Sequence, residues 1–377
     1  MSRTLLVTND FPPTIGGIQS YLRDFLRTLD PRDVVVFAST QDADAAADYD
    51  KSVDYTVVRW PRKVMLPTPA TAREMQRLIR KHDIETVWFG AAAPLALMAS
   101  AARKAGAHRI VATTHGHEVG WSMLPGARQA LRRIGDTSDV VTYISEYTRR
   151  RLTRAFGPHP RWVHLPSAVS LEDFVPATET QKVNARQHFG LGKGPVIVCI
   201  SRWVPRKGQD QLLRAMPRVR ETYPDAQLLI IGRGSYGSTL RVLAKQYCPD
   251  AVLREARDSE ELLMALHAAD IFAMPARTRG GGLDVEGLGI VYLEAQAAGL
   301  PVIAGDSGGA SETVTPESGV VVRGAVLAEL EEAVERLLGD VPLRHHMAIS
   351  GRRHVEEHWT WDIMGARLRD VLECDRS

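Results

Sequence analysis

The residues best suited to chemistry lie in a short glycine-rich segment with a carboxylate at each end, Glu286-Gly-Leu-Gly-Ile-Val-Tyr-Leu-Glu294. The glycines favour a loop around Glu286, followed by a helix that carries Glu294. Backbone N–H groups at the start of that helix are suited to bind a phosphate, and the carboxylates to accept hydrogen bonds from sugar hydroxyls. The alternative, a capped helix with two surface glutamates, explains neither these glycines nor the preceding Gly280–Gly282. The expected backbone donors are Gly287, Leu288, Gly289 and Ile290.

A second cluster is basic and follows the strand-like run Val196–Ser201. In Ser201-Arg-Trp-Val-Pro-Arg-Lys-Gly208, the cations Arg202, Arg206 and Lys207 stand between that strand and a helical pattern. Cations in a loop at a strand end suit a diphosphate, because guanidinium and ammonium groups donate charge-assisted hydrogen bonds to phosphate oxygens. A solvated basic loop is the alternative.

Two further motifs follow strands in the first half of the chain. Gly16 and Gly17 stand directly before a helical pattern, where backbone N–H groups can approach a phosphate; a tight turn without a ligand is the alternative. Thr114-His-Gly-His-Glu118 has residue types that bind zinc, but no second His/Asp cluster supplies more ligands. A histidine beside a reacting sugar, or one stacked within a loop, fits equally well.

Two weaker patterns favour other functions. Gly232-Arg-Gly-Ser-Tyr-Gly237, with Glu255 further on, matches a dinucleotide-binding fingerprint. It follows the second strand of its domain, whereas the fingerprint belongs to the first, which argues against a dehydrogenase. Asp42-Ala-Asp44 resembles a metal-binding Asp-x-Asp, but we place it in an acidic, alanine-rich loop exposed to solvent.

The elements that position these motifs alternate between strand-like and helix-like runs, which predicts parallel sheets covered on both faces. The alternation pauses around 169–194, a polar stretch with Gly190-Leu-Gly-Lys-Gly194 that we interpret as a linker. This divides the chain into two doubly wound α/β domains, 1–168 and 195–357, followed by a terminal helix within 358–377. The first-half strands are expected at Thr4–Thr8, Val34–Ala38, Tyr55–Val58, Thr86–Phe89, Ile110–Thr114, Val140–Ile144 and Trp162–Leu165. The second-half strands are expected at Val196–Ser201, Gln227–Ile231, Ala251–Arg254, Ile271–Met274, Val302–Ala304 and Gly319–Val322.

Composition limits the class of protein. The chain has 377 residues, 44% hydrophobic and 24% charged, which is ordinary for a globular protein of two domains. The N-terminus reads as a strand and not as a signal peptide, and no apolar run spans a bilayer. Three dispersed cysteines favour a reducing, cytoplasmic location. Residues 1–168 carry 23 Lys or Arg and 16 Asp or Glu, whereas the remainder carries 24 Lys or Arg and 29 Asp or Glu. The basic first half suits an anionic partner such as a lipid surface, and an uneven surface charge without such a partner is the alternative.

Taken together, Gly16-Gly17, Arg202–Gly208, Glu286–Glu294 and Glu294-Ala-Gln-Ala-Ala-Gly-Leu-Pro-Val-Ile-Ala304 resemble the family 4 retaining glycosyltransferases of the GT-B fold over nearly the whole chain. The resemblance implies two Rossmann-like domains facing across a cleft. Domain 1–168 would bind the acceptor, 195–357 would bind the nucleotide sugar, and the helix within 358–377 would pack on the first domain.

Residue by residue, the resemblance implies a donor site. Arg202 and Lys207 would bind the diphosphate, with Gly16 and Gly17 against the same phosphates. Glu294 would hold the ribose. The sugar hydroxyls and β-phosphate would be held by Glu286 and by Gly287, Leu288, Gly289 and Ile290. His115 would lie by the sugar and support its developing positive charge, through either its ring or its backbone.

Three stretches resemble a narrower subgroup, the actinobacterial GDP-mannose-dependent phosphatidylinositol monomannoside mannosyltransferases: Pro12–Arg23, His115–Trp121 and Thr278–Gly289. This implies GDP-mannose as donor, an inositol phospholipid as acceptor, an α-1,6 linkage, no metal or other cofactor, no nucleic-acid partner, and peripheral binding to the cytoplasmic face of the plasma membrane. The insertion Thr278–Val285 departs from the broader family. Acceptor or membrane contacts are expected at Gln19, His117, Arg128, Arg132 and Arg133.

Three alternatives stay open at this stage. A family 4 hexosyltransferase could act on a soluble sugar or glycan, a nucleotide-sugar 2-epimerase shares the architecture, and a non-catalytic nucleotide-sugar-binding protein is disfavoured by the intact Arg202, Lys207 and Glu286.

Overall fold

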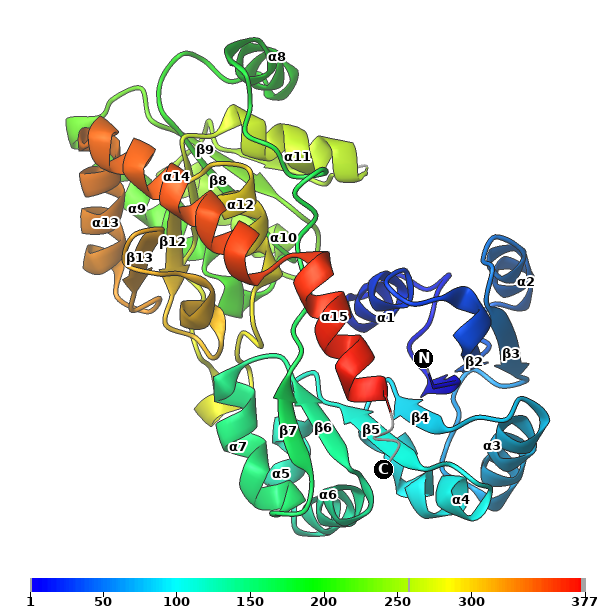
Figure 1. The fold of residues 1–377 in the computed structure, drawn as a ribbon. Helices are drawn as coiled ribbons and strands as arrows, with labels where there is room; N and C mark the ends of the chain where they lie inside the picture. The colour runs from blue at the N-terminus through cyan, green and yellow to red at the C-terminus, as the bar shows by residue number, and fades with distance from the viewer. Residues whose placement is uncertain (1, 257, 374–377) are drawn as a thin grey trace. The chain divides into compact units, whose positions relative to one another are not determined.

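The computed structural model describes residues 2–256 and 258–373, and the chain forms two compact units (Figure 1). The first unit comprises the residues up to Ser167 together with the chain from Trp361, and the second comprises Ala168–Thr360. The last helix of the chain therefore belongs to the first unit, and the two units are described separately below.

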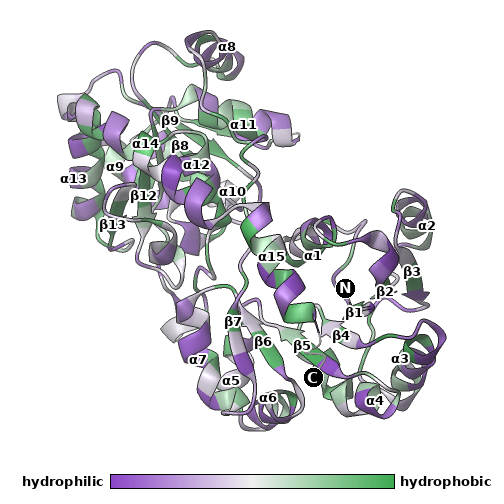
Figure 2. Ribbon diagram, in the orientation of Figure 1, coloured by the Kyte–Doolittle hydropathy of each residue, from purple (hydrophilic) through white to green (hydrophobic). Residues whose placement is uncertain are grey.

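The first unit contains a seven-stranded parallel sheet in the order β3-β2-β1-β4-β5-β6-β7. Strand order reverses between β1 and β4, which makes the carboxyl ends of these strands the place where such sheets bind ligands. Every residue of β1 is buried, and hydrophobic residues run along β5 and β6 in Figure 2. The strands are β1 (Thr4–Thr8), β2 (Val34–Ser39), β3 (Thr56–Trp60), β4 (Thr86–Phe89), β5 (Arg109–Thr113), β6 (Val140–Tyr143) and β7 (Arg161–His164).

The helices of the first unit are amphipathic segments that cover this sheet. Helix α1 buries Tyr21, Leu22, Phe25 and Leu26, at the spacing of one helical face. The helices are α1 (Gly17–Leu26), α2 (Ala43–Lys51), α3 (Pro69–Lys81), α4 (Ala99–Lys104), α5 (Glu118–Ser122), α6 (Pro125–Thr137), α7 (Glu146–Phe156) and α15 (Trp361–Leu372).

Helix α2 corrects one sequence interpretation. Asp42-Ala-Asp44 is not a loop: α2 begins at Ala43, and the carboxylate of Asp42 accepts a hydrogen bond from the backbone N–H of Ala45 at 3.1 Å. Asp42 is therefore an N-cap residue, which explains its presence without a metal.

Helix α15 packs against the elements of the first unit. The rings of Phe25 and Trp361 make an edge contact at 5.2 Å, and Gly365 lies so close to Thr28 that a Cβ atom would meet its side chain at 2.8 Å. The hydroxyl of Thr86 donates to the carbonyl of Leu372 at 2.8 Å. The terminal helix expected within 358–377 is therefore α15, and residues 374–377 lie outside those that the structure describes.

The second unit contains a six-stranded parallel sheet in the order β10-β9-β8-β11-β12-β13. Its strand order reverses between β8 and β11, so the loops that follow these two strands flank the ligand-binding edge. The strands are β8 (Val196–Ile200), β9 (Gln227–Ile231), β10 (Val252–Arg254), β11 (Ile271–Met274), β12 (Val302–Gly305) and β13 (Gly319–Val322). The helices are α8 (Glu179–Phe189), α9 (Gln209–Thr222), α10 (Gly237–Tyr247), α11 (Ser259–Ala268), α12 (Ile290–Ala297), α13 (Leu327–Gly339) and α14 (Val341–His358).

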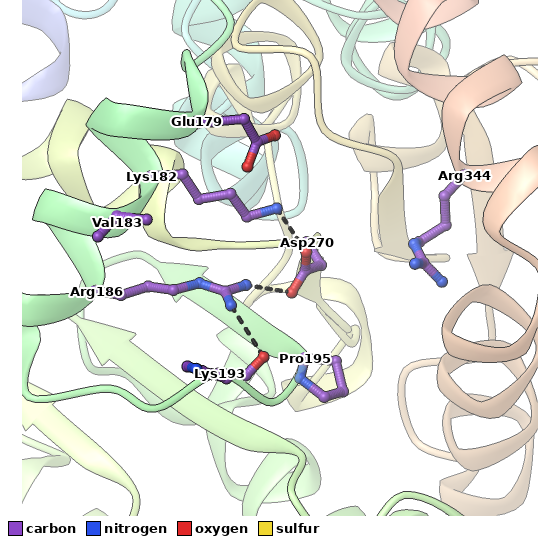
Figure 3. Close-up of a pocket in the computed structure, with 8 residues that line it drawn as sticks. All are labelled: Glu179, Lys182, Val183, Arg186, Lys193, Pro195, Asp270 and Arg344. Carbon is purple, nitrogen blue, oxygen red and sulfur yellow. Dashed lines mark hydrogen bonds and ion pairs between the residues drawn. The ribbon is translucent and has the colours of Figure 1, made fainter.

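The stretch 169–194, which we interpreted as a linker, is part of the second unit and contains α8. Lys182 and Arg186 of α8 converge on the carboxylate of Asp270, each at 2.7 Å (Figure 3). The other face of the same helix buries Ala185 and Phe189, one turn apart. Because the other residues of α8 are mostly polar, these two apolar residues were too few to indicate a helix in the sequence. Lys182 and Arg186 are two of the four cations that line the cavity in Figure 3, and their pairing with Asp270 holds α8 against the loop that precedes β11.

Among residues 2–256 and 258–373, no helix is both long and apolar enough to cross a membrane.

Candidate functional site

The loops after β8 and β11 place the two strongest sequence motifs at the same edge of the second sheet. Lys207 ends a short 3-10 turn (Pro205–Lys207), and its ammonium lies 2.7 Å from the Oε2 atom of Glu286. Both side chains are only 9% exposed, so this is a buried ion pair. A buried ammonium with one partner keeps further N–H donors for an incoming ligand, and its position is already fixed.

The insertion Thr278–Val285 contacts Arg206, a second cation of this loop. Arg206 has its Nε atom 3.7 Å from Glu286 Oε2 and its Nη1 atom 3.4 Å from Asp284 Oδ1. Within the insertion, Arg279 and Asp284 exchange backbone hydrogen bonds of 2.9 and 3.2 Å, which makes a compact bridge. Arg206 therefore braces Glu286 and the insertion, a role that the sequence did not reveal.

Arg202 is positioned differently. Its side chain is exposed, and among the described residues no acidic side chain pairs with it. Its backbone carbonyl accepts a hydrogen bond from Gln209 Nε2 at 2.9 Å, which fixes the loop. Arg202 thus presents an unpaired guanidinium at the edge of the sheet where a diphosphate would need one.

Glycines allow the segment around Glu286 to turn into α12. Gly289 has φ of +88° and forms the N-cap of α12, which no side chain caps. Gly308 packs so closely that a Cβ atom would lie 2.0 Å from the Glu286 carbonyl oxygen. No side chain caps the first turn of α12, next to Glu286, and an uncapped helix N-terminus of this kind is suited to bind a phosphate. Gly287, Leu288 and Gly289 precede the helix and Ile290 is its first residue.

Glu294 lies on α12 and is half-buried. Burial raises the pKa of its carboxyl to about 7. No described residue forms a hydrogen bond or ion pair with this carboxyl group, which leaves its oxygens available to ligand hydroxyls.

In the first unit, His115 follows β5. Its Nε2 atom lies 2.7 Å from the Gly90 carbonyl oxygen, which can only accept, so Nε2 carries the proton. Burial lowers the pKa of His115 to about 4, and the ring is therefore neutral at neutral pH. The ring also makes an edge contact with Tyr21 at 4.9 Å. His115 is thus a fixed, uncharged dipole, able to support positive charge without carrying one.

Glu118 organises the histidine loop, a role that the sequence interpretation did not assign. It is fully buried, and its Oε2 atom accepts hydrogen bonds from the backbone N–H groups of His115 at 3.1 Å and Gly116 at 3.0 Å. His117 is exposed, with its Nε2 atom 3.4 Å from Glu118 Oε1. No group of three or more potential metal ligands occurs in the described parts of the chain, so the metal-binding interpretation of this loop has no further ligand to support it.

Gly16 and Gly17 begin α1 beside the end of β1. A Cβ atom on Gly17 would meet nothing within 4 Å, whereas one on Gly16 would lie 2.3 Å from Gln19 Oε1. Gly17 therefore borders open space, and Gly16 makes room for the Gln19 side chain. Gln19 in turn donates to Asp10 at 3.2 Å, a neighbour that sequence reasoning passed over.

The three arginines expected at a membrane lie on α6 and are all exposed. Arg132 pairs with Asp136 at 3.0 Å, while Arg128 and Arg133 have no acidic partner among the described residues. Met123 and Leu124, directly before this helix, are 51% and 63% exposed.

The dinucleotide-like glycines have a packing role. A Cβ atom on Gly232 would lie 1.9 Å from the Ser201 carbonyl oxygen, and one on Gly234 would lie 2.4 Å from that of Trp203. These glycines let the loop after β9 pack on the β8 loop, so the fingerprint is explained without a dinucleotide.

Two protein families match this chain. The family described as Glycosyltransferase Family 4 matches residues 15–173, and the family described as Glycosyl transferases group 1 matches residues 181–354. The chain is 59% identical over 374 residues to the GDP-mannose-dependent monoacylated alpha-(1-6)-phosphatidylinositol monomannoside mannosyltransferase of Corynebacterium glutamicum, covering 99% of this chain and 98% of that protein. It is 52% identical to the GDP-mannose-dependent alpha-(1-6)-phosphatidylinositol monomannoside mannosyltransferase of Mycolicibacterium smegmatis, covering 99% and 98%.

Solved structures share the fold at low sequence identity. Anabaena HepE in complex with UDP matches with a TM-score of 0.81 at 16% identity, covering 99% of both chains. Sucrose-phosphate synthase from Thermosynechococcus elongatus matches with a TM-score of 0.77 at 20% identity, covering 98% of both chains.

Proposed function

This chain belongs to the glycosyltransferases with family 4 and group 1 domains, and from that premise we propose that it transfers mannose from GDP-mannose to a phosphatidylinositol monomannoside through an α-1,6 linkage. The observation that carries the proposal is the 59% identity to a mannosyltransferase of this specificity over 374 residues. The buried pair of Lys207 and Glu286, next to the uncapped start of α12, supports a donor site in the second unit.

In the proposed reaction, the bond between mannose C1 and the diphosphate oxygen breaks while the acceptor hydroxyl oxygen bonds to C1 on the same face. The proton of that hydroxyl passes to the departing phosphate oxygen, so no protein base is required. Arg202, Lys207 and the N–H groups that open α12 stabilise the negative charge on GDP. One preorganised donor of this kind contributes on the order of 3 kcal/mol to transition-state stabilisation.

The mannose and the ribose of the donor need different partners. In the proposed donor site, Glu286 accepts hydrogen bonds from the mannose hydroxyls and Glu294 accepts them from the ribose hydroxyls. Neutral His115, held by the Gly90 carbonyl, supports the oxocarbenium-like sugar as a dipole. Because Arg202, Lys207 and the N–H groups that open α12 supply positive charge to the departing diphosphate, we propose that the reaction needs no divalent ion.

We also propose that the protein binds the cytoplasmic face of the plasma membrane through α6. Arg128 and Arg133 suit anionic lipid head groups, and the exposed Met123 and Leu124 suit the adjoining apolar layer. Changing Arg128, Arg132 and Arg133 together to glutamate should abolish sedimentation with anionic liposomes. Unchanged sedimentation would refute this part of the proposal.

Labelled GDP-mannose, offered with phosphatidylinositol monomannoside in mixed micelles and EDTA, tests the whole assignment. A dimannosylated lipid from GDP-mannose, and none from UDP-glucose, would support the donor, the acceptor and the independence from metal. GDP binding without a lipid product would redirect the search to soluble sugar or glycan acceptors. Conversion of the donor sugar without any acceptor would favour the epimerase instead.

A further inference from the structure

The cavity between α8 and α14 lies on the opposite side of the second sheet's edge from the proposed donor site. Its lining residues Pro195 and Asp270 directly precede β8 and β11, so the cavity lies at the amino ends of these neighbouring strands (Figure 3). The loops that carry Lys207 and Glu286 follow the carboxyl ends of the same two strands. A molecule bound in this cavity would therefore be a second ligand and not the nucleotide sugar.

Positive charge is in excess around the cavity. Figure 3 shows Arg344 of α14 across the cavity from Lys182 and Arg186 of α8. The cavity has a volume of about 340 Å³, and its charged lining residues leave a net charge of +2: Lys182, Arg186, Lys193, Arg344, Glu179 and Asp270. This charge is matched by an anion that carries two negative charges.

Asp270 holds the two cations of α8 in place. Its Oδ1 atom accepts a hydrogen bond from the Lys182 ammonium at 2.7 Å, and its Oδ2 atom accepts from the Arg186 guanidinium at 2.7 Å and from the backbone N–H of Val196 at 2.8 Å. The Lys182 and Arg186 side chains are only 29% and 15% exposed. Asp270 thus cancels one positive charge but fixes the position of two.

The cations retain hydrogen-bond donors that the protein does not use. Lys182 donates one of its three N–H groups, to Asp270. Arg344 donates only from Nη1, to the carbonyls of Leu337 and Leu338 at the end of α13. Its Nε–H and one Nη2–H point along the same edge of the guanidinium and have no acceptor among the described residues, and this edge can bind two phosphate oxygens side by side.

We propose that this cavity binds a small phosphate monoester of a polyol, such as a sugar phosphate, with the phosphate between Lys182, Arg186 and Arg344. A phosphate monoester carries about −1.5 to −2 charge at pH 7, which matches the cavity. A water molecule occupies about 30 Å³ in the liquid, so the phosphate group fills roughly half of the cavity and leaves room for the organic part. The carboxylate of Glu179, which also lines the cavity, is suited to accept hydrogen bonds from the hydroxyls of that part.

The two helices that face the cavity lie near the ends of the second unit. Helix α8 is the first helix after the chain enters this unit at Ala168, and α14 is the last before it leaves at Thr360. A phosphate held by both helices would link these two ends of the unit. Amide exchange in α8 and α14 should therefore slow when the ligand binds.

Titration calorimetry on the full chain tests the inference, with glucose 6-phosphate and inorganic phosphate as probes. We expect saturable binding of the ester, tighter than that of inorganic phosphate. Arg344→Gln and Lys182→Gln should each weaken it about ten- to hundredfold, as when a hydrogen bond to a charged group is lost. If Arg344→Gln fails to fold, Lys182→Gln still provides the test, because Asp270 keeps its bonds from Arg186 and Val196.

Arg202→Gln is the matched control, because it removes the same charge at the opposite edge of the same sheet, and its affinity for the ester should stay within twofold of wild type. No saturable binding of the ester, or cavity variants within twofold of wild type, would overturn the inference. An equal loss in Arg202→Gln would also overturn it, because the ester would then occupy the donor edge. Inorganic phosphate that binds as tightly as the ester would overturn the assignment to a phosphate monoester. None of these measurements depends on mannose transfer, so their outcome is separate from that of the proposed function.

Discussion

The buried pair of Lys207 and Glu286 gives the sharpest stability prediction. Lys207→Met keeps most of the side-chain volume but leaves the Glu286 carboxylate buried without its ammonium partner at 2.7 Å. Removing one partner of a buried ion pair costs about 3–5 kcal/mol of unfolding free energy. Arg206, whose Nε atom lies 3.7 Å from the same oxygen, remains as a weaker partner, so we expect the lower part of this range.

Amide hydrogen exchange, read by mass spectrometry, measures the stability of each unit separately. For Lys207→Met, protection should fall in the second unit and stay unchanged in the first. Adding Glu286→Leu to Lys207→Met should restore much of the lost stability, because the unpaired charge is gone, but it should not restore mannose transfer.

Lys51→Met is the control, because its pair with Asp48 is exposed, at 74% and 79% for the two side chains. An exposed pair contributes about 0–1 kcal/mol, so this variant should exchange almost like wild type. If Lys207→Met lowered the stability of the second unit no more than Lys51→Met lowers that of the first, the reasoning from the buried pair would be refuted.

Three further predictions concern Gly17 and two titratable side chains, His115 and Glu294, whose pKa values are shifted by burial. Gly17→Ala should fold normally, because the added Cβ atom would meet no atom within 4 Å. If phosphate oxygens of the donor contact the Gly17 backbone, the variant should bind GDP-mannose about ten- to hundredfold more weakly. An unchanged affinity in calorimetry would remove Gly17 from the donor site. His115 has a pKa of about 4 in the folded chain against 6.5 for the free side chain, so the unfolded chain takes up this proton first as the pH falls. The free energy of unfolding should therefore decrease as the pH drops from 6.5 to 4. Urea titrations of His115→Asn at several pH values should lack this part of the decrease. Glu294 has a pKa of about 7 in the folded chain against 4.5 for the free side chain, so its contribution to the free energy of unfolding should fall as the pH rises from 4.5 to 7. Over the same range the donor KM should decrease, because the ionised carboxylate is the better hydrogen-bond acceptor. A Glu294→Gln variant with the same pH profile as wild type would contradict both expectations.

The strands were the most predictable part of the fold. The expected bounds of Thr4–Thr8, Thr86–Phe89 and Ile271–Met274 agree with the structure at both ends. These strands are buried along their whole length, so each is a short, mostly apolar run that the local pattern of residue types reveals. A local pattern is sufficient when every side chain of an element faces the interior.

Two helices were missed for a related reason. Helix α8 was interpreted as linker and α2 as loop, since both are mostly polar and bury few residues: Ala185 and Phe189 in α8, and Ala46 in α2. Their caps at Thr178 and Asp42 were the available signals. For such helices, packing and capping decide the structure more than a hydrophobic stripe does.

The sequence by itself determined the two α/β units, the loops that carry the site and the residue types within them, because these follow from local patterns and from spacing along the chain. Only the tertiary structure decided which groups are partners. It paired Lys207 with Glu286, turned Arg206 toward the insertion, fixed the neutral form of His115 against Gly90, and brought Gln19 to Asp10. Most of these contacts join residues that are far apart along the chain, so they form only when the chain packs. The spacing of residues in the sequence does not reveal them.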